Sequence, residues 1–153
     1  RYYFAAKLNN KVEDIDLNFD DYVQRINSDL VGKYLNIASR SASFLKKNNN
    51  ILSTNIDNNI LDNLASKKDE IVSLYESREY SKLVRIIMDL ADDVNKYINE
   101  QTPWKKEMDE AVDISSTAIK AFYILSLYLN LPNPFIEINS FPTLKIKSPS
   151  LKI

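Results

Sequence analysis

The sequence predicts an all-α fold, a bundle of amphipathic helices, and three observations carry this prediction. Apolar residues recur at three- and four-residue intervals in four long segments, which is the spacing of one face of an α-helix. No strand pattern separates these segments. The 153 residues include a single glycine, Gly32, whereas tight hairpins and phosphate-binding loops depend on glycine. We therefore expect a helical bundle and neither a β-rich fold nor a glycine-rich nucleotide loop.

The first seventeen residues are predicted to form a connector, with a helix end over Arg1–Leu8 and a polar stretch to Leu17. Asn18, followed three residues later by Asp21, has the pattern of a helix-capping box. The first long helix is expected to run from there to about Lys47. Its apolar stripe consists of Phe19, Val23, Ile26, Leu30, Tyr34, Ile37 and Leu45.

Three further helices follow in the same way. The second begins near Asp57 and carries Ile60, Leu61, Leu64, Ile71, Leu74 and Tyr75 on one face. The third carries Tyr80, Leu83, Val84, Ile87, Leu90, Ala91, Val94, Tyr97 and Ile98. It is expected to stop at Thr102, because a residue before proline is pushed out of the α region. The fourth spans about Asp109 to Asn130, with Val112, Ala118, Ile119, Phe122, Leu125 and Leu129 facing inward.

Three segments result: the connector 1–17, the helical bundle 18–131 and an irregular arm 132–153. The arm is rich in proline and serine, which disfavours a helix and favours an extended chain. The chain begins without methionine, at a sequence typical of the middle of a helix, so we expect a piece of a longer protein.

Composition argues against an independent catalytic centre. The chain has no cysteine and no histidine, which removes disulfides, zinc–thiolate sites, the commonest general base and the commonest metal ligand. The carboxylate pairs Asp14/Asp16, Asp20/Asp21 and Asp92/Asp93 are interpreted as caps and solvated faces, so no metal site is expected. No apolar run approaches the ~20 residues that span a bilayer, and no signal peptide opens the chain, so a cytoplasmic protein without a membrane segment is expected.

One polar stripe on the first predicted helix could bind a ligand. Lys33, Asn36, Arg40, Ser43 and Lys47 are three and four residues apart and so share a face. The stripe could be an ordinary solvated surface. Asn36 and Arg40, however, would present an amide and a guanidinium side by side, and these are the groups best suited to read base edges. The net charge of −1 gives no general attraction to nucleic acid, but a charge pattern can be local.

Trp104 is the only tryptophan, and it follows Pro103 and precedes two lysines, Lys105 and Lys106. It could be a core residue displaced into a loop or a hot spot for a partner protein. It could also be a stacking platform for an unpaired base, with the lysines close to phosphates. From its position alone these three interpretations stay open.

Several long motifs resemble bacterial methionyl-tRNA synthetases just downstream of the catalytic domain. They are RYYFAAKL, the connector NNKVEDIDLN, DDYVQRINSDLVGKYLNIASR, and, after a gap, YESREYSKLVRIIMDLADDVNKYINEQTPW. The resemblance implies a class I synthetase anticodon-binding bundle, preceded by the end of the stem-contact region. Such synthetases usually continue in helices after the fourth one, whereas this chain becomes rich in Pro and Ser after Leu131.

The resemblance also implies a function. In the family an Asn and an Arg four residues apart, together with a Trp that follows a Pro, read the anticodon CAU, and these positions match Asn36, Arg40 and Trp104. Supporting or phosphate contacts are assigned to Pro103, Lys33, Lys47 and Lys105. The expected partners are methionine tRNA and the catalytic domain of the same parent chain, which would bind the ATP. The chain itself is expected to hold no catalytic residue and no cofactor. The alternatives are a helical protein-interaction domain and the anticodon domain of a related class I synthetase.

Overall fold

The computed structural model describes residues 1–11 and 14–130, and throughout this part of the chain the regular elements are helices. The all-α prediction is therefore confirmed for these residues. The predicted arm, 132–153, lies outside them. In chain order the elements are α1 (Tyr2–Ala5), α2 (Phe19–Arg25), η1 (Ile26–Leu35), α3 (Asn36–Lys47), α4 (Asn58–Ser66), α5 (Lys68–Glu76), α6 (Tyr80–Gln101), η2 (Pro103–Lys105) and α7 (Met108–Asn130).

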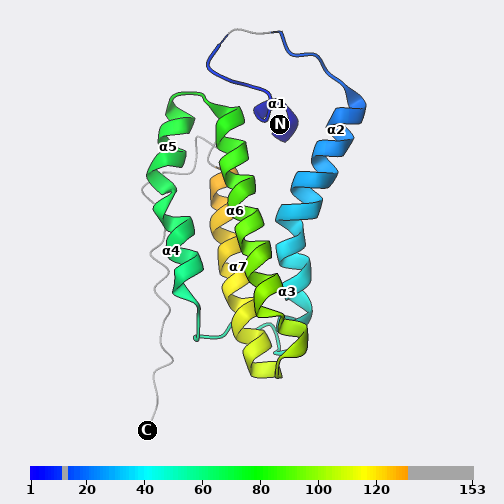
Figure 1. Cartoon of the computed structure of the whole chain (residues 1–153), viewed down its shortest axis with the longest axis vertical. Coiled ribbons are helices and arrows are strands. Elements are labelled where there is room, and N and C mark those ends of the chain that lie inside the picture. Colours follow the sequence, from blue (N-terminus) through cyan, green and yellow to red (C-terminus); the bar gives the residue numbers. More distant parts are fainter. Residues whose placement is uncertain (12–13, 131–153) are drawn as a thin grey trace.

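The helices pack as a bundle with α7 near its centre (Figure 1). The segments α2, η1 and α3 follow one another without a break and form one long rod, which runs in the same direction as α6. Helix α7 returns in the opposite direction and packs against α3, α4 and α6. The core between them consists of fully buried apolar side chains such as Ile37, Leu64, Ile87, Val94 and Leu125.

The predicted cap of the first helix is present. The Asn18 side chain accepts hydrogen bonds from the backbone N–H groups of Asp20 (2.9 Å) and Asp21 (3.0 Å). The return bond of a capping box is replaced, because the Asn18 N–H donates to the hydroxyl of Tyr3 instead (3.3 Å). The Asp21 carboxylate pairs with Lys7 at 2.9 Å. The cap therefore also attaches the connector to the rod.

The apolar stripe expected on the first helix is only partly buried. Ile37 and Leu45 lie in the core, whereas Phe19 is 73% exposed and Val23 is 53% exposed. Two features explain this error. Figure 1 shows α2 standing away from α6 and α7, with only α1 beside it. The segment η1 is a π-helix of 10 residues, and its wider turn does not continue the 3.6-residue register that the prediction assumed.

The remaining predicted helices are confirmed with small changes. The second is two helices, α4 and α5, joined at Lys67. The third ends at Gln101, as predicted from Pro103, and Thr102 adopts the left-handed conformation with φ 46° and ψ 57°. The fourth begins at Met108. Its stretch Met108–Leu129 has a mean hydropathy of 1.2, enough by length and composition to cross a membrane, yet 50% of the window is buried inside the bundle. It is thus the central helix of a core.

Tyr128 makes the stability of this core sensitive to high pH. Its side chain is 1% exposed, and its hydroxyl donates to the carbonyl of Leu64 at 2.8 Å. Burial raises the pKa of Tyr128 from 10.0 to about 12. Because the pKa is higher in the folded state, this contribution is complete below pH ~10 and is lost as the pH rises toward ~12, by about 1.4 kcal/mol per pH unit.

We expect the free energy of unfolding, measured by denaturant titration, to fall between about pH 10 and about pH 12. The Tyr128→Phe variant should show a shallower fall, since it cannot ionise. An equal fall in the variant would show that other groups cause the alkaline loss of stability.

Candidate nucleic-acid interface

Three side-chain bonds join the polar face of the rod to α6. We call the six residues that form them the polar ladder. Each pair is separated by 59 residues, because the rod and α6 run in the same direction in register. The bonds are Lys33 Nζ to Asp92 Oδ2 (2.6 Å), Asn36 Nδ2 to Asn95 Oδ1 (3.0 Å) and Arg40 Nη2 to Asn99 Oδ1 (2.6 Å).

Asn95 is held firmly at the middle of the polar ladder. Its amide nitrogen donates to the carbonyls of Lys33 and Ala91, both at 2.9 Å. Its amide oxygen therefore faces Asn36 in one fixed orientation. Asn36 uses one amide hydrogen in this contact and retains its own amide oxygen as an acceptor. The half-buried Asn36 side chain is thus oriented before any ligand arrives.

Lys33 is engaged within the protein. Its hydrogen bond with Asp92 raises the pKa of the Lys33 ammonium above its ordinary value, and the charges of Asp92, Asp29 and Asp89 add to this effect. Burial acts in the opposite direction and is outweighed. Lys33 is therefore a charged, paired residue of the ladder, and this pairing weakens its predicted role as a phosphate contact.

Arg40 links the polar ladder to Trp104. The central carbon of its guanidinium lies 5.4 Å from the centroid of the Trp104 ring, within the range of a cation–π interaction. A guanidinium carries five N–H donors, and Asn99 accepts from Nη2. Further donors stay available to a ligand, beside an aromatic ring that is 52% exposed.

The turn that carries Trp104 is built rigidly. Thr102 has a positive φ of 46°, a strained conformation for a β-branched residue. Pro103 is buried, and the Lys105 N–H donates to the carbonyl of Thr102 at 2.9 Å. The short helix η2 packs against α7. With its backbone fixed in this way, Trp104 remains 52% exposed outside the core, so the interpretation of Trp104 as a core residue does not hold.

The polar stripe predicted on the first helix therefore divides in two. Lys33, Asn36 and Arg40 bond to α6, so they are not an ordinary solvated face, whereas Ser43 and Lys47 are exposed. Lys105 is exposed next to Trp104 and has no salt bridge among the described residues. Within residues 1–11 and 14–130, no three acidic side chains gather in a way that could hold a metal ion.

The α6 half of the polar ladder was missed from the sequence. Asp92 was interpreted as part of a solvated acidic pair, and it is exposed, but its pairing with Lys33 at 2.6 Å was not foreseen. Asn95 and Asn99 were not singled out. Their signal was present: Asp92, Asn95 and Asn99 repeat the three- and four-residue spacing of Lys33, Asn36 and Arg40. A spacing alone, however, does not show that two polar faces meet.

Comparison with known proteins indicates one family of enzymes. The family model "tRNA synthetases class I (M)" matches residues 1–42, a range that includes Asn36 and Arg40. A methionine–tRNA ligase from Ralstonia nicotianae is 46% identical over 150 residues, which is 92% of this chain and 22% of the relative. The chain is homologous to part of the methionine–tRNA ligases. A ligase from Psychrobacter arcticus is 43% identical over 153 residues, 95% of this chain and 22% of the relative. A ligase from Chromobacterium violaceum is 47% identical over 136 residues, which is 84% of this chain and 20% of the relative.

The chain thus spans about a fifth of the length of the methionine–tRNA ligases that it matches. The homology covers most of the helical bundle, including α6 and the turn with Trp104, because the aligned segments take up 84–95% of the chain.

Proposed function

We propose that this chain is the part of a methionine–tRNA ligase that recognises the CAU anticodon of methionine tRNA. The observation that supports this most is the position of Arg40, oriented by Asn99 and placed against a half-exposed tryptophan. Asn36 precedes Arg40 by one helical turn and is oriented in the same way by Asn95. An amide, a guanidinium and an exposed ring on one face form a surface suited to unpaired bases.

Each of these groups has a separate task in the proposal. The Asn36 amide and the Arg40 guanidinium each make hydrogen bonds to base edges, which discriminates among anticodons. The Trp104 ring stacks on one unpaired base, while Pro103 holds the turn in place. Lys47 and Lys105 are exposed, and they attract phosphates without reading the sequence.

The parent enzyme that we propose attaches methionine to its tRNA through an ATP-dependent adenylate, in the cytoplasm. That chemistry belongs to a catalytic domain of the same parent chain, which also binds the ATP. Nothing in the chain of 153 residues supplies a histidine, a cysteine or a glycine-rich loop for it. Its contribution to the reaction is therefore the choice of tRNA.

We expect the chain by itself to form no adenylate. The measurement is exchange of labelled pyrophosphate into ATP in the presence of methionine, with a complete methionine–tRNA ligase as the positive control. Exchange above background that increases with the concentration of the chain would contradict this division of labour.

The experiment that tests the proposal compares two RNA hairpins that differ only in the anticodon. The chain should bind a hairpin with the CAU anticodon more tightly than one with an altered anticodon at the same salt concentration. If each lost base contact costs about 1–3 kcal/mol, the figure for base pairs in DNA, one altered base lowers the affinity by about 5- to 150-fold. Equal affinities would refute anticodon recognition.

A further inference from the structure

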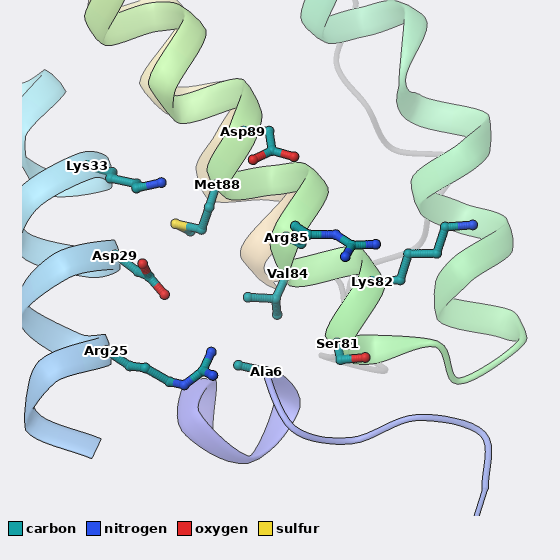
Figure 2. A pocket seen from close by; sticks show the side chains of 10 residues that line it. All are labelled: Ala6, Arg25, Asp29, Lys33, Ser81, Lys82, Val84, Arg85, Met88 and Asp89. Atoms are coloured by element: carbon teal, nitrogen blue, oxygen red, sulfur yellow. The ribbon is translucent and has the colours of Figure 1, made fainter. Parts of the chain in front are cut away.

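A cavity of about 350 Å³ lies between the rod and the amino-terminal half of α6, with α1 below it in Figure 2. Buried Val84 and Met88 contribute apolar surface to its wall. The remainder is strongly charged, with side chains that come from both helices. The charged residues that line it are Arg25, Asp29, Lys33, Lys82, Arg85 and Asp89.

The carboxylates of this cavity are already occupied in part by the protein. Asp29 accepts a hydrogen bond from the hydroxyl of Tyr2 at 2.7 Å and one from Ser28 at 3.1 Å. Asp29 and Asp89 both act electrostatically on Lys33, which is paired with Asp92. The acidic groups are thus gathered around one lysine.

The two cations from α6, Lys82 and Arg85, are not paired with carboxylates in this way. Among the residues that the structure describes, neither Lys82 nor Arg85 has a carboxylate oxygen within 4.0 Å, the limit for a salt bridge, and both are exposed. Within residues 1–11 and 14–130, the Arg25 guanidinium, from α2, is bound through its Nε alone, to Asp21 at 3.3 Å. Its terminal nitrogens remain available to a ligand. The α6 wall of the cavity therefore carries two exposed cations, whose side chains extend away from the rod in Figure 2, and Arg25 adds its terminal nitrogens from the rod.

The cavity continues the surface of the polar ladder. Lys33 belongs to both, and Arg85 lies 14 positions before Asn99 on the same helix. At a rise of 1.5 Å per residue, this separation is about 21 Å along α6. Phosphates follow one another at about 3.4 Å per strand along a duplex axis, so about six steps of a nucleic-acid strand span the same distance.

We propose that this cavity binds backbone phosphates of the RNA whose anticodon lies on Asn36, Arg40 and Trp104. The inference rests on the proposed function and extends it. The contacts come from Lys82, Arg85 and Arg25 and fall about six nucleotides from the anticodon. They fix the orientation of the RNA along the groove and carry no sequence information, because every nucleotide presents the same phosphate.

The test uses the double variant Lys82→Ala/Arg85→Ala and a hairpin whose stem extends well beyond six base pairs. A matched control, Lys67→Ala/Lys96→Ala, removes the same charge elsewhere. Lys67 joins α4 to α5, and Lys96 lines a separate depression beside α4. A conservative variant, Lys82→Arg/Arg85→Lys, retains both charges. Circular dichroism of all the variants verifies that each is folded before affinities are compared.

We expect the double variant to bind the CAU hairpin and the altered hairpin more weakly by the same factor, about 2- to 30-fold for two exposed ion pairs. The dependence of log affinity on log salt should become shallower by about 2, one for each lost phosphate contact. The conservative variant should bind as the unmodified chain does, and the control should change neither affinity nor slope.

Two results would overturn the inference and leave the proposed function intact. One is a double variant that binds as tightly as the control, while the unmodified chain still prefers CAU. The other is an equal loss of RNA affinity in the double variant and in the control, which would indicate a general electrostatic attraction to RNA and no specific site. An unmodified chain that binds both hairpins equally would instead contradict the proposed function. In the first of these two cases, a loss of affinity for an acidic peptide in the same double variant would assign the cavity to a protein partner.

Discussion

Replacing Arg40 with alanine is expected to weaken binding of the CAU hairpin by about 1–3 kcal/mol, with a much smaller effect on an altered hairpin. The variant removes the guanidinium that contacts both Asn99 and the Trp104 ring. Arg40 is only half-buried and lies outside the core, so the free energy of unfolding should change by no more than about 0.5 kcal/mol. Equilibrium binding to both hairpins, with a denaturant titration of each variant, measures the two effects separately.

Arg40→Lys is the matched control, because it retains the positive charge and loses the planar fork that allows paired hydrogen bonds. We expect it to lose discrimination almost as fully as the alanine variant. The Asn36→Ala variant should also discriminate less well among anticodons. The loss should be comparable in size and limited to the base that Asn36 contacts. A variant of Arg40 that loses equal affinity for both hairpins would identify Arg40 as a phosphate contact and would contradict base reading.

The lysines provide a comparison for this result. The variants Lys47→Ala and Lys105→Ala should weaken binding of both hairpins equally. Each should make the slope of log affinity against log salt shallower by about 1, as the loss of a phosphate contact does. Lys33 was grouped with them on its sequence position. Because its ammonium lies 2.6 Å from Asp92, we expect a smaller effect from Lys33→Ala.

Replacing Ile87 with alanine is expected to have the largest effect on stability. The side chain is 0% exposed and lies on α6 in the middle of the core. Truncation of a buried isoleucine to alanine costs about 2–5 kcal/mol through lost transfer energy and the cavity that remains. The measurement is the free energy of unfolding from denaturant titration. The dependence of this free energy on denaturant concentration should stay the same if only stability has changed.

Phe19→Ala is the control for this experiment. The sequence pattern placed Phe19 on the same buried stripe as Ile37, but the structure exposes 73% of Phe19 and none of Ile37. We therefore expect Phe19→Ala to alter the free energy of unfolding by no more than about 0.5 kcal/mol. A loss of several kcal/mol from Phe19→Ala would show that α2 is packed more closely than the structure indicates.

Much of the fold could be predicted from the sequence, because the period of the apolar residues is a direct consequence of helix geometry. The inward faces of α6 and α7 follow from it, and the end of α6 follows from the restriction that Pro103 places on Thr102. The π-helix η1 could not be predicted in this way. It alters the register inside the first helix, and the extent of burial at Phe19 depends on which helices reach α2.

The candidate site was predicted in part for a similar reason. Asn36 and Arg40 stood out because they share a helix face, and Trp104 stood out because it is apolar in a polar segment. Asn95 and Asn99 did not stand out, since polar residues on an exposed helix face are ordinary. Their role depends on the register between two helices 59 residues apart, which is a property of the packed bundle.

The most direct test of anticodon recognition uses the fluorescence of Trp104, which is the only tryptophan. Its ring is 52% exposed in the free protein, so its emission should be red-shifted. Stacking on one base is worth about 1–3 kcal/mol, and it should quench this emission as the CAU hairpin is added. A hairpin with an altered anticodon should have little effect at the same concentration. Blue-shifted emission that responds to neither hairpin, or equal quenching by both, would contradict the account.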